Sequence, residues 1–497
     1  MKRIIFAAIL SVWFGVPLNA AETPNIVILY ADDMGFGDLG ANNPDSKIPT
    51  PHLDRLAREG LRLTDGHSSS GICTPSRYAL LTGRYHWRKF HGIVQAFGPP
   101  VIDQEELTLP EILKEKGYRT ACIGKWHLGW NWDEIIREDA EVKRNGGNRV
   151  IRPEAFDWSK PISGGPTSHG FDEYFGDDVP NFPPYAWFQD DHVLGQPSVM
   201  LTKTPKTPEG SWSARPGPAV KDWDFWEVVP KLADEAVDWI SRQKGKPEPF
   251  FLYVPFNSPH SPIVPTKEFI GTSQAGPFGD FVHMTDAMAG KVLEALRENG
   301  FEDNTLVIFT ADNGAEKYAY ERVKKFGHWS SAPFRGVKRD LYEGGHHVPF
   351  VVKWPGKIKP GSTSDALISQ VDLMGTIAAI IDYQLPEDSA HDSFNQLPVW
   401  TSLEASPRET IVHNTATKAY AIRDGSWLLV DAQSGSHNRI PKWFDEERGY
   451  QKDDQPGELY DLSKDPAQKS NLYRSNPDLV QQLKQKLKSI QASGQVR

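Results

Sequence analysis

The chain has 497 residues, and its 55 Lys and Arg residues against 65 Asp and Glu residues give a formal net charge of −10. This negative balance, without a basic stripe, argues against nucleic acid as a partner. The fractions of charged and hydrophobic residues, 24% and 39%, are those of a folded protein. Only two cysteines occur, Cys73 and Cys122, which excludes a disulfide scaffold and a zinc site built from several thiolates.

The first twenty residues have the layout of a secretory signal peptide. Lys2 and Arg3 precede an apolar run, Pro17 breaks it, and residues 18–20 fit a cleavage site. The alternative is an N-terminal membrane anchor, but the run is shorter than the roughly 20 residues that a bilayer requires. We therefore expect a periplasmic or secreted protein with no membrane span after cleavage, whose two thiols would enter an oxidising compartment.

Continuous apolar runs alternate with helical patterns through most of the chain. This alternation predicts an α/β domain with a mostly parallel sheet, in which ligands bind beyond the carboxyl ends of the strands. The strand-like runs cover residues 25–30, 118–124, 250–256, 305–310 and 349–354, and the helical patterns cover 52–59, 109–116, 228–241 and 281–299.

Two stretches depart from this alternation. Residues 131–224 are rich in Gly, Pro and Trp, and we interpret them as long loops over the sheet in which most Trp side chains serve packing. After about residue 382, short strand-like segments are followed by an amphipathic helix at 478–491. We therefore expect a main domain at 21–385 and an α+β subdomain at 386–497 with an antiparallel sheet and a terminal helix.

Acidic residues follow two of the predicted strands. Asp32 and Asp33 come after the first strand, and Asp312 and Asn313 come after residues 305–310. Carboxylate and amide oxygens are ligands that Ca²⁺ and Mg²⁺ prefer. Either pair alone is more often a turn or a helix cap, but two pairs at the same kind of position support each other.

The segment Cys-Thr-Pro-Ser-Arg begins at Cys73. Pro75 suits the first turn of a helix, which places Cys73 at the helix N-terminus and Arg77 one turn later. Both the helix and the guanidinium would stabilise an anion beside residue 73. The alternative is a buried structural cysteine.

Together these segments resemble the type I, formylglycine-dependent sulfatases of the alkaline phosphatase superfamily. Six motifs occur in the family's order and span nearly the whole chain after residue 20, although residues 131–224 and the C-terminal third match less well. The resemblance implies an alkaline-phosphatase-like sandwich. The motifs are the opening strand and metal motif at 25–35, the signature at 70–83, the Lys/His motif at 124–129, the later histidine motif at 257–260, the second metal motif at 310–314, and the second lysine loop at Lys338 and 342–345.

The resemblance also implies two cofactors. A separate maturation enzyme would convert Cys73 to Cα-formylglycine, which would leave Cys122 without a partner. One hydroxyl of the hydrated aldehyde would be the nucleophile. The expected metal is Ca²⁺, with Mg²⁺ second, and its ligands would be Asp32, Asp33, residue 73, Asp312 and Asn313.

Each basic residue of the motifs receives a role from the same resemblance. Lys125 and Lys338 would bind sulfate oxygens, and Arg77 would lower the pKa of the attacking hydroxyl. Attack on sulfur would give a sulfo-enzyme, with His260 protonating the leaving oxygen. His127 would then take a proton from the second hydroxyl, which expels sulfate. Outside this context such lysines are usually surface charges and such histidines structural.

We therefore expect a sulfuric ester hydrolase that acts on a sulfated polysaccharide or oligosaccharide, since Trp faces can stack on sugar rings. An ordinary arylsulfatase role, the ring position, endo or exo action and the oligomeric state stay open. Two rivals are a phosphate or phosphonate ester hydrolase of the same superfamily and an inactive glycan-binding protein, although every nucleophile and ligand position is filled. Three histidines near Lys338 are further candidates for substrate contact, namely His328, His346 and His347.

Overall fold

The structure is a computed structural model that describes residues 23–145, 147–202, 206–209, 214–452 and 454–496. The predicted signal peptide at residues 1–20 lies outside the described residues. Within the described ranges, no helix combines the length and the apolar character needed to cross a bilayer.

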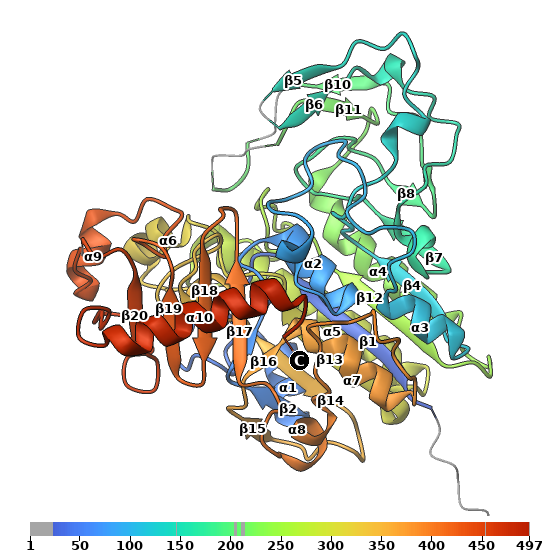
Figure 1. Cartoon of the computed structure of the whole chain (residues 1–497). Coiled ribbons are helices and arrows are strands. Elements are labelled where there is room, and N and C mark those ends of the chain that lie inside the picture. Colours follow the sequence, from blue (N-terminus) through green and yellow to red (C-terminus); the bar gives the residue numbers. More distant parts are fainter. Residues whose placement is uncertain (1–22, 146, 203–205, 210–213, 453, 497) are drawn as a thin grey trace, which may run out of the picture.

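A ten-stranded mixed sheet lies at the centre of the molecule (Figure 1). In spatial order its strands are β15 (Ser362–Ser364), β2 (Leu61–Leu63), β14 (Phe350–Lys353), β13 (Thr305–Ala311), β1 (Asn25–Ala31), β12 (Phe250–Pro255), β4 (Arg119–Ile123), β7 (Glu173–Gly176), β8 (Phe188–Gln189) and β9 (His192–Val193). The strands from β13 to β7 are parallel, which confirms the predicted α/β class. Strand β14 pairs antiparallel with β13 and β2, so the run at 349–354 differs in direction from the other four.

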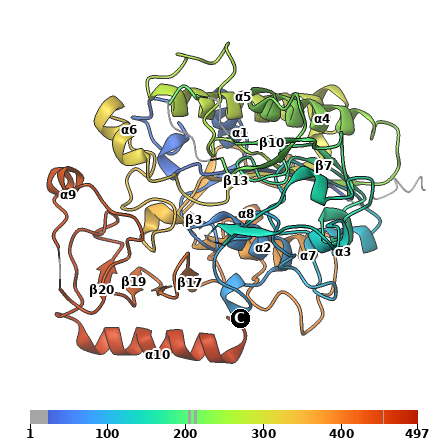
Figure 2. The ribbon, with the colours of Figure 1, turned by 90° about the horizontal axis from the view of Figure 1, so that it is seen from above.

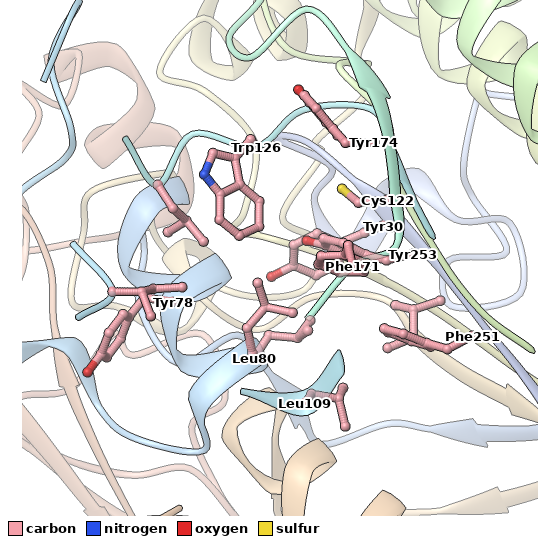
Figure 3. Packing of buried hydrophobic residues seen from close by; sticks show 14 of the residues in the cluster. Tyr30, Tyr78, Leu80, Leu109, Cys122, Trp126, Phe171, Tyr174, Phe251 and Tyr253 are labelled. Atoms are coloured by element: carbon pink, nitrogen blue, oxygen red, sulfur yellow. The ribbon is translucent and has the colours of Figure 1, made fainter. Parts of the chain in front are cut away.

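Helices cover both faces of the sheet because its central strands are apolar on both sides. Ile28 of β1 belongs to one buried cluster and Leu29 to the other, as the two-residue period of a strand requires. Figure 2 shows the two helical layers on opposite sides, and Figure 3 shows part of the first cluster around Cys122. Helices α2 (Cys73–Thr82), α3 (Leu109–Glu115) and α7 (Leu373–Ile380) pack on the first face, and α1 (Pro51–Glu59), α4 (Val228–Ser241) and α5 (Gly276–Glu298) on the second.

The stretch at 131–224 is more ordered than the sequence suggested. It contributes β7, β8 and β9 to the central sheet and also forms two-stranded ribbons above it (Figure 1). Trp132 and Trp158 are buried among apolar side chains, which agrees with the predicted packing role, whereas Trp212 lies outside the described residues. The ribbons are β5 (Lys143–Asn145) with β6 (Asn148–Val150) and β10 (Val199–Leu201) with β11 (Gly217–Ala219).

The C-terminal region forms the predicted antiparallel sheet and terminal helix. Its four strands are β17 (Thr410–Asn414), β18 (Tyr420–Asp424), β19 (Trp427–Val430) and β20 (Glu458–Asp461), and α10 (Pro477–Ser493) lies across them. Ala79 of α2 joins the same buried cluster, so this region packs against the helix that begins at Cys73. The remaining elements are α6 (Ala319–Phe326), α8 (Leu397–Ser402), α9 (Lys442–Arg448) and the paired β3 (Gly66–His67) and β16 (Ile368–Ser369).

Candidate active site

The pairing of β1 with β13 brings the two acidic segments together. These strands are parallel neighbours with Ala31 opposite Ala311, so the residues that follow them emerge at the same edge. The backbone N–H of Asp33 donates to Asp312 Oδ1 at 3.1 Å. The amide of Asn313 donates to Asp33 Oδ1 at 2.7 Å. All of these side chains are buried, which places the predicted ligands in one cluster.

Helix α2 begins at Cys73, as the sequence predicted. The ligand atoms of Cys73, Asp32 and Asp312 all lie within 4.8 Å of one another. One turn along α2, the guanidinium of Arg77 donates to Asp312 Oδ2 at 2.8 Å and to the Lys125 carbonyl at 3.1 Å. The sulfur of Cys73 therefore lies beside the acidic cluster, at the start of a helix.

The acidic cluster has oxygens without partners. Asp32 Oδ1, Asp33 Oδ2 and Asn313 Oδ1 are buried and accept no hydrogen bond from the described residues. A buried oxygen without a donor is costly, and oxygens of this chemical type suit a hard divalent cation. The residues present therefore fit a Ca²⁺ or Mg²⁺ ion.

Each acid also has a buried basic partner. Lys125 Nζ lies 2.6 Å from Asp32 Oδ2, and Lys338 Nζ lies 2.6 Å from Asp33 Oδ1. Burial opposes ionisation of Asp33, but the buried ammonium group of Lys338 holds its pKa well below the usual range. Burial also raises the pKa of Asp312 to about 6, and the negative charge of Asp32 adds to this shift.

The two predicted catalytic histidines lie on the cavity side of this cluster. His260 Nε2 is 3.7 Å from Asp33 Oδ2, and burial lowers the pKa of His260 to about 3. Burial also holds the pKa of His127 well below its usual value, with Lys125 contributing. Because a neutral imidazole is a poor acid, His260 would donate a proton only after an anionic substrate has raised its pKa.

The loop that carries His127 is held in an unusual conformation. His127 has a φ of 55°, a region that side chains other than Gly rarely adopt. Its N–H donates to Asp178 Oδ1 at 3.1 Å, and its Nε2 lies 3.0 Å from the Val94 carbonyl. Its Nδ1 is buried without a hydrogen-bond partner in the described part of the chain. Strain of this kind clusters at functional sites, and the free nitrogen is consistent with a catalytic base.

A cavity of about 290 Å³ opens beside these residues. The predicted residues on its wall are Cys73, His127, His260 and Lys338. The sequence indicated that 131–224 covers the site but gave no signal for which side chains face it. From that stretch, sequence reasoning missed Asn181, Phe182 and Arg215, and from elsewhere in the chain it missed Gln95 and Arg339.

A second acidic pair behind the site was also missed. Asp177 and Asp178 follow β7 directly, but the sequence analysis predicted no strand at 173–176, so the strand-end rule that pointed to Asp32 could not be applied there. Asn257 donates to both carboxylate oxygens of Asp177, at 2.6 and 2.7 Å. Burial raises the pKa of Asp177 to about 7 and that of Asp178 to about 6. Through its bond to the backbone of His127, Asp178 holds the loop that carries this histidine.

The three further histidines near Lys338 do not line this cavity. His328 Nε2 lies 2.8 Å from Asp38 Oδ1. His347 Nδ1 lies 2.9 Å from Glu343 Oε2. His346 is fully buried and faces other histidines. The suggested substrate contact of these residues therefore finds no support, because none of the three lies on the wall of this cavity.

Comparisons with known proteins agree with this site. The family model described as Sulfatase matches residues 24–383. The chain is 32% identical over 508 residues to an N-acetylgalactosamine-6-O-sulfatase of Bacteroides thetaiotaomicron, covering 95% of this chain and 93% of that protein. It is 32% identical over 483 residues to human arylsulfatase A, covering 94% and 88%. A solved structure described under the metabolism of multiple glycosaminoglycans by Bacteroides thetaiotaomicron aligns with a TM-score of 0.78 at 31% identity, over 94% of this chain and 99% of that one.

Proposed function

Because this chain belongs to the sulfatase family, we propose that it removes sulfate from a sulfated carbohydrate of the glycosaminoglycan type. The observation that carries the proposal is the position of Cys73, which lies within 4.8 Å of two acids of the cluster and on the wall of the cavity. The similarity to an N-acetylgalactosamine-6-O-sulfatase supports a 6-sulfated amino sugar as the substrate. The cavity volume lies near the lower end of the ~300–1,000 Å³ range of small-molecule sites, which suits one sugar at a chain end.

The proposed nucleophile is a hydroxyl of the hydrated formylglycine derived from Cys73. Its position at the start of α2 places it near the positive end of the helix. Arg77 supports the deprotonated hydroxyl from the next turn, where it is already held by Asp312 and the Lys125 carbonyl. The hydroxyl attacks sulfur in line with the leaving oxygen. The new O–S bond of a sulfo-enzyme forms as the bond between sulfur and the sugar oxygen breaks.

The acidic cluster would hold Ca²⁺ rather than Mg²⁺ through Asp32, Asp33, Asp312, Asn313 and residue 73. When bound, such an ion supplies Lewis-acid polarisation of a sulfate oxygen. Lys125 and Lys338 neutralise further sulfate oxygens. Both ammonium groups are buried, where charge stabilisation is worth more than in water.

Two histidines divide the proton transfers. His260 protonates the departing sugar oxygen, which needs a proton because an alkoxide is a poor leaving group. His127 removes the proton of the second hydroxyl, so that the aldehyde re-forms and the bond from residue 73 to the sulfate oxygen breaks. No water attacks sulfur in this sequence. The free Nδ1 of His127 is the atom that supports this assignment.

Three further proposals concern the maturation, export and domain organisation of the protein. A formylglycine-generating enzyme would act on the segment at 73–77. Residues 1–20 would direct export to the periplasm or beyond. The domain division at residue 385 also stays a proposal.

The test is desulfation of a panel of defined oligosaccharides, with NMR of the released positions and a phosphate ester as comparison. We expect release of 6-O-sulfate from a terminal N-acetylgalactosamine and a much lower kcat/KM on the phosphate ester. Turnover of aryl sulfates alone would contradict the carbohydrate proposal. A preference for the phosphate ester would contradict the sulfatase mechanism.

A further inference from the structure

The wall of the cavity carries a positive charge that the proposed hydrolysis does not use. Arg215 lines the same cavity as Cys73 and His127. In the part of the chain that the structure describes, neither an ion pair nor a guanidinium hydrogen bond links Arg215 to another residue. Burial lowers the pKa of Arg215, and only weaker contributions from Tyr185 and Cys73 oppose this shift.

Arg339, the other arginine on the cavity wall, differs from Arg215 in its ion pairing. Arg339 lines the cavity too, but its guanidinium donates to Glu316 Oε1 at 2.7 Å. The charge of Arg339 is therefore balanced, whereas no described residue balances that of Arg215. The positive charge of Arg339 also lowers the pKa of Arg215. The guanidinium of Arg215 therefore lies near a like charge, and a bound anion would stabilise it.

The side chain of Arg215 is nevertheless held in place. Its guanidinium carbon lies 3.8 Å from the centroid of the Phe182 ring, and the same ring meets the His127 ring edge to face at 5.5 Å. Its backbone N–H donates to the Asn181 carbonyl at 3.0 Å, and its carbonyl accepts from the Tyr185 hydroxyl at 2.6 Å. Stacking fixes a guanidinium without consuming its N–H donors. Within the described residues, all five donors therefore stay available for a ligand.

From this arrangement we propose that Arg215 is a specificity residue that binds a second anionic group of the glycan, either a carboxylate or another sulfate, while the scissile sulfate lies beside residue 73. This inference rests on the proposed function and names its substrate class more narrowly as a sulfated sugar with a second negative charge. A planar guanidinium binds both groups through paired hydrogen bonds. The neutral Gln95 and Asn181 on the same wall would contact hydroxyl or amide groups between the two anions.

The experiment compares kcat/KM of the mature enzyme on matched substrates. One is N-acetylgalactosamine 6-sulfate, with a single anion. The second joins this sugar to a uronic acid, the third replaces the uronic acid by the neutral hexose, and the fourth carries a second sulfate on one sugar. We expect the wild type to prefer one or both doubly charged substrates. The preferred substrate identifies the second anion as a carboxylate or a sulfate.

The decisive quantity is the ratio of kcat/KM between doubly and singly charged substrates. Arg215→Ala should lower this ratio about 10- to 100-fold, the usual effect of losing a charge-assisted hydrogen bond, and mainly through KM. Arg215→Lys should recover part of it, because the charge returns without the planar fork. Arg152→Ala is the matched control, since Arg152 is exposed on the same stretch and pairs with Glu154. Its ratio should equal that of the wild type.

Two results would overturn the inference. One is a wild type without preference for a second anion, and the other is an Arg215→Ala enzyme that loses the same factor on every substrate. If the wild type cleaves no glycan, the proposed function fails instead, and inhibition of aryl sulfate turnover by the uronic acid disaccharide then decides the inference. An inhibition constant that Arg215→Ala leaves unchanged would reject it, and one that rises tenfold or more would support it.

Discussion

Lys338 and Asp33 form a fully buried ion pair, with Nζ 2.6 Å from Oδ1, although they are 305 positions apart in the chain. The second oxygen of Asp33 has no hydrogen-bond donor among the described residues. Asp33 thus connects the lysine loop to the cluster that we assign to the metal. The same carboxylate is the link between stability and metal binding.

Removal of the lysine should therefore produce a defect that the metal partly repairs. Lys338→Ala leaves a buried carboxylate without its cation, which typically costs about 3–5 kcal/mol. Because Asp33 is then free to share a divalent ion, added Ca²⁺ should raise the Tm of Lys338→Ala more than that of the wild type. Thermal unfolding with and without Ca²⁺ measures this difference.

Lys291→Ala is the control for this measurement, because Lys291 forms a half-exposed pair with Asp234 at 2.9 Å. Exposed pairs contribute only about 0–1 kcal/mol, so its Tm should stay near that of the wild type. An equal Ca²⁺ response in Lys338→Ala and the wild type would contradict the assignment of Asp33 as a metal ligand.

Conversion of Cys73 to formylglycine should change the mass of the peptide that contains it. Peptide mass spectrometry of active enzyme should show formylglycine, which is lighter than cysteine, and an unmodified thiol in fully active protein would refute the mechanism. Cys73→Ala should lose turnover but keep nearly all stability, because the site loses only one small side chain. Cys73→Ser should accumulate a sulfated enzyme, since a serine ester lacks the second hydroxyl that expels sulfate.

The sequence was sufficient for the parts of the fold and site that depend on local pattern. The apolar runs placed β1 and β13, and residues at their carboxyl ends were expected to meet. The Cys-Thr-Pro-Ser-Arg segment gave the start of α2 at Cys73. These features follow from the period of a strand and the chemistry of a helix start, which a single sequence contains.

Other parts depend on contacts between distant segments. Arg215 faces the cavity because Phe182 and Asn181 hold it there, and no local pattern in a Gly- and Pro-rich stretch indicates such a contact. Likewise the direction of β14 is set by its pairing with β13 and β2. The apolar run at 349–354 is compatible with either direction.

The carboxyl of Asp286 predicts how stability depends on pH. It lies on α5 and accepts the N–H groups of Leu53 and His52 at the start of α1, and burial raises its pKa to about 7. Between pH 4 and 7 the folded state keeps a proton that the unfolded state has lost, so stability falls as pH rises through this interval. Asp286→Asn should remove that contribution.

The measurement is Tm at pH 5 and at pH 7.5 for the wild type and Asp286→Asn. Relative to the variant, the wild type should lose stability at the higher pH, by on the order of a few kcal/mol given 1.36 kcal/mol per pKa unit. Asp222→Asn, at an exposed position, controls for the loss of one negative charge. A difference between wild type and Asp286→Asn that is the same at both pH values would reject the shifted pKa.

The two histidines should differ in their dependence on the leaving group. His260 is assigned as the general acid, so His260→Ala should lose far more activity on a sulfated sugar than on a nitrophenyl sulfate, whose leaving group scarcely needs a proton. General acid catalysis contributes ~10²–10⁴-fold, and the gap between the substrates should approach that range.

His127 acts after the leaving group has departed, so His127→Ala should slow both substrates alike and trap sulfate on residue 73. Since kcat/KM reports only steps through the first irreversible one, the trapping should appear in kcat and in burst kinetics. Equal losses for His260→Ala on both substrates, or a sulfo-enzyme that accumulates only in that variant, would require the two roles to be exchanged or abandoned.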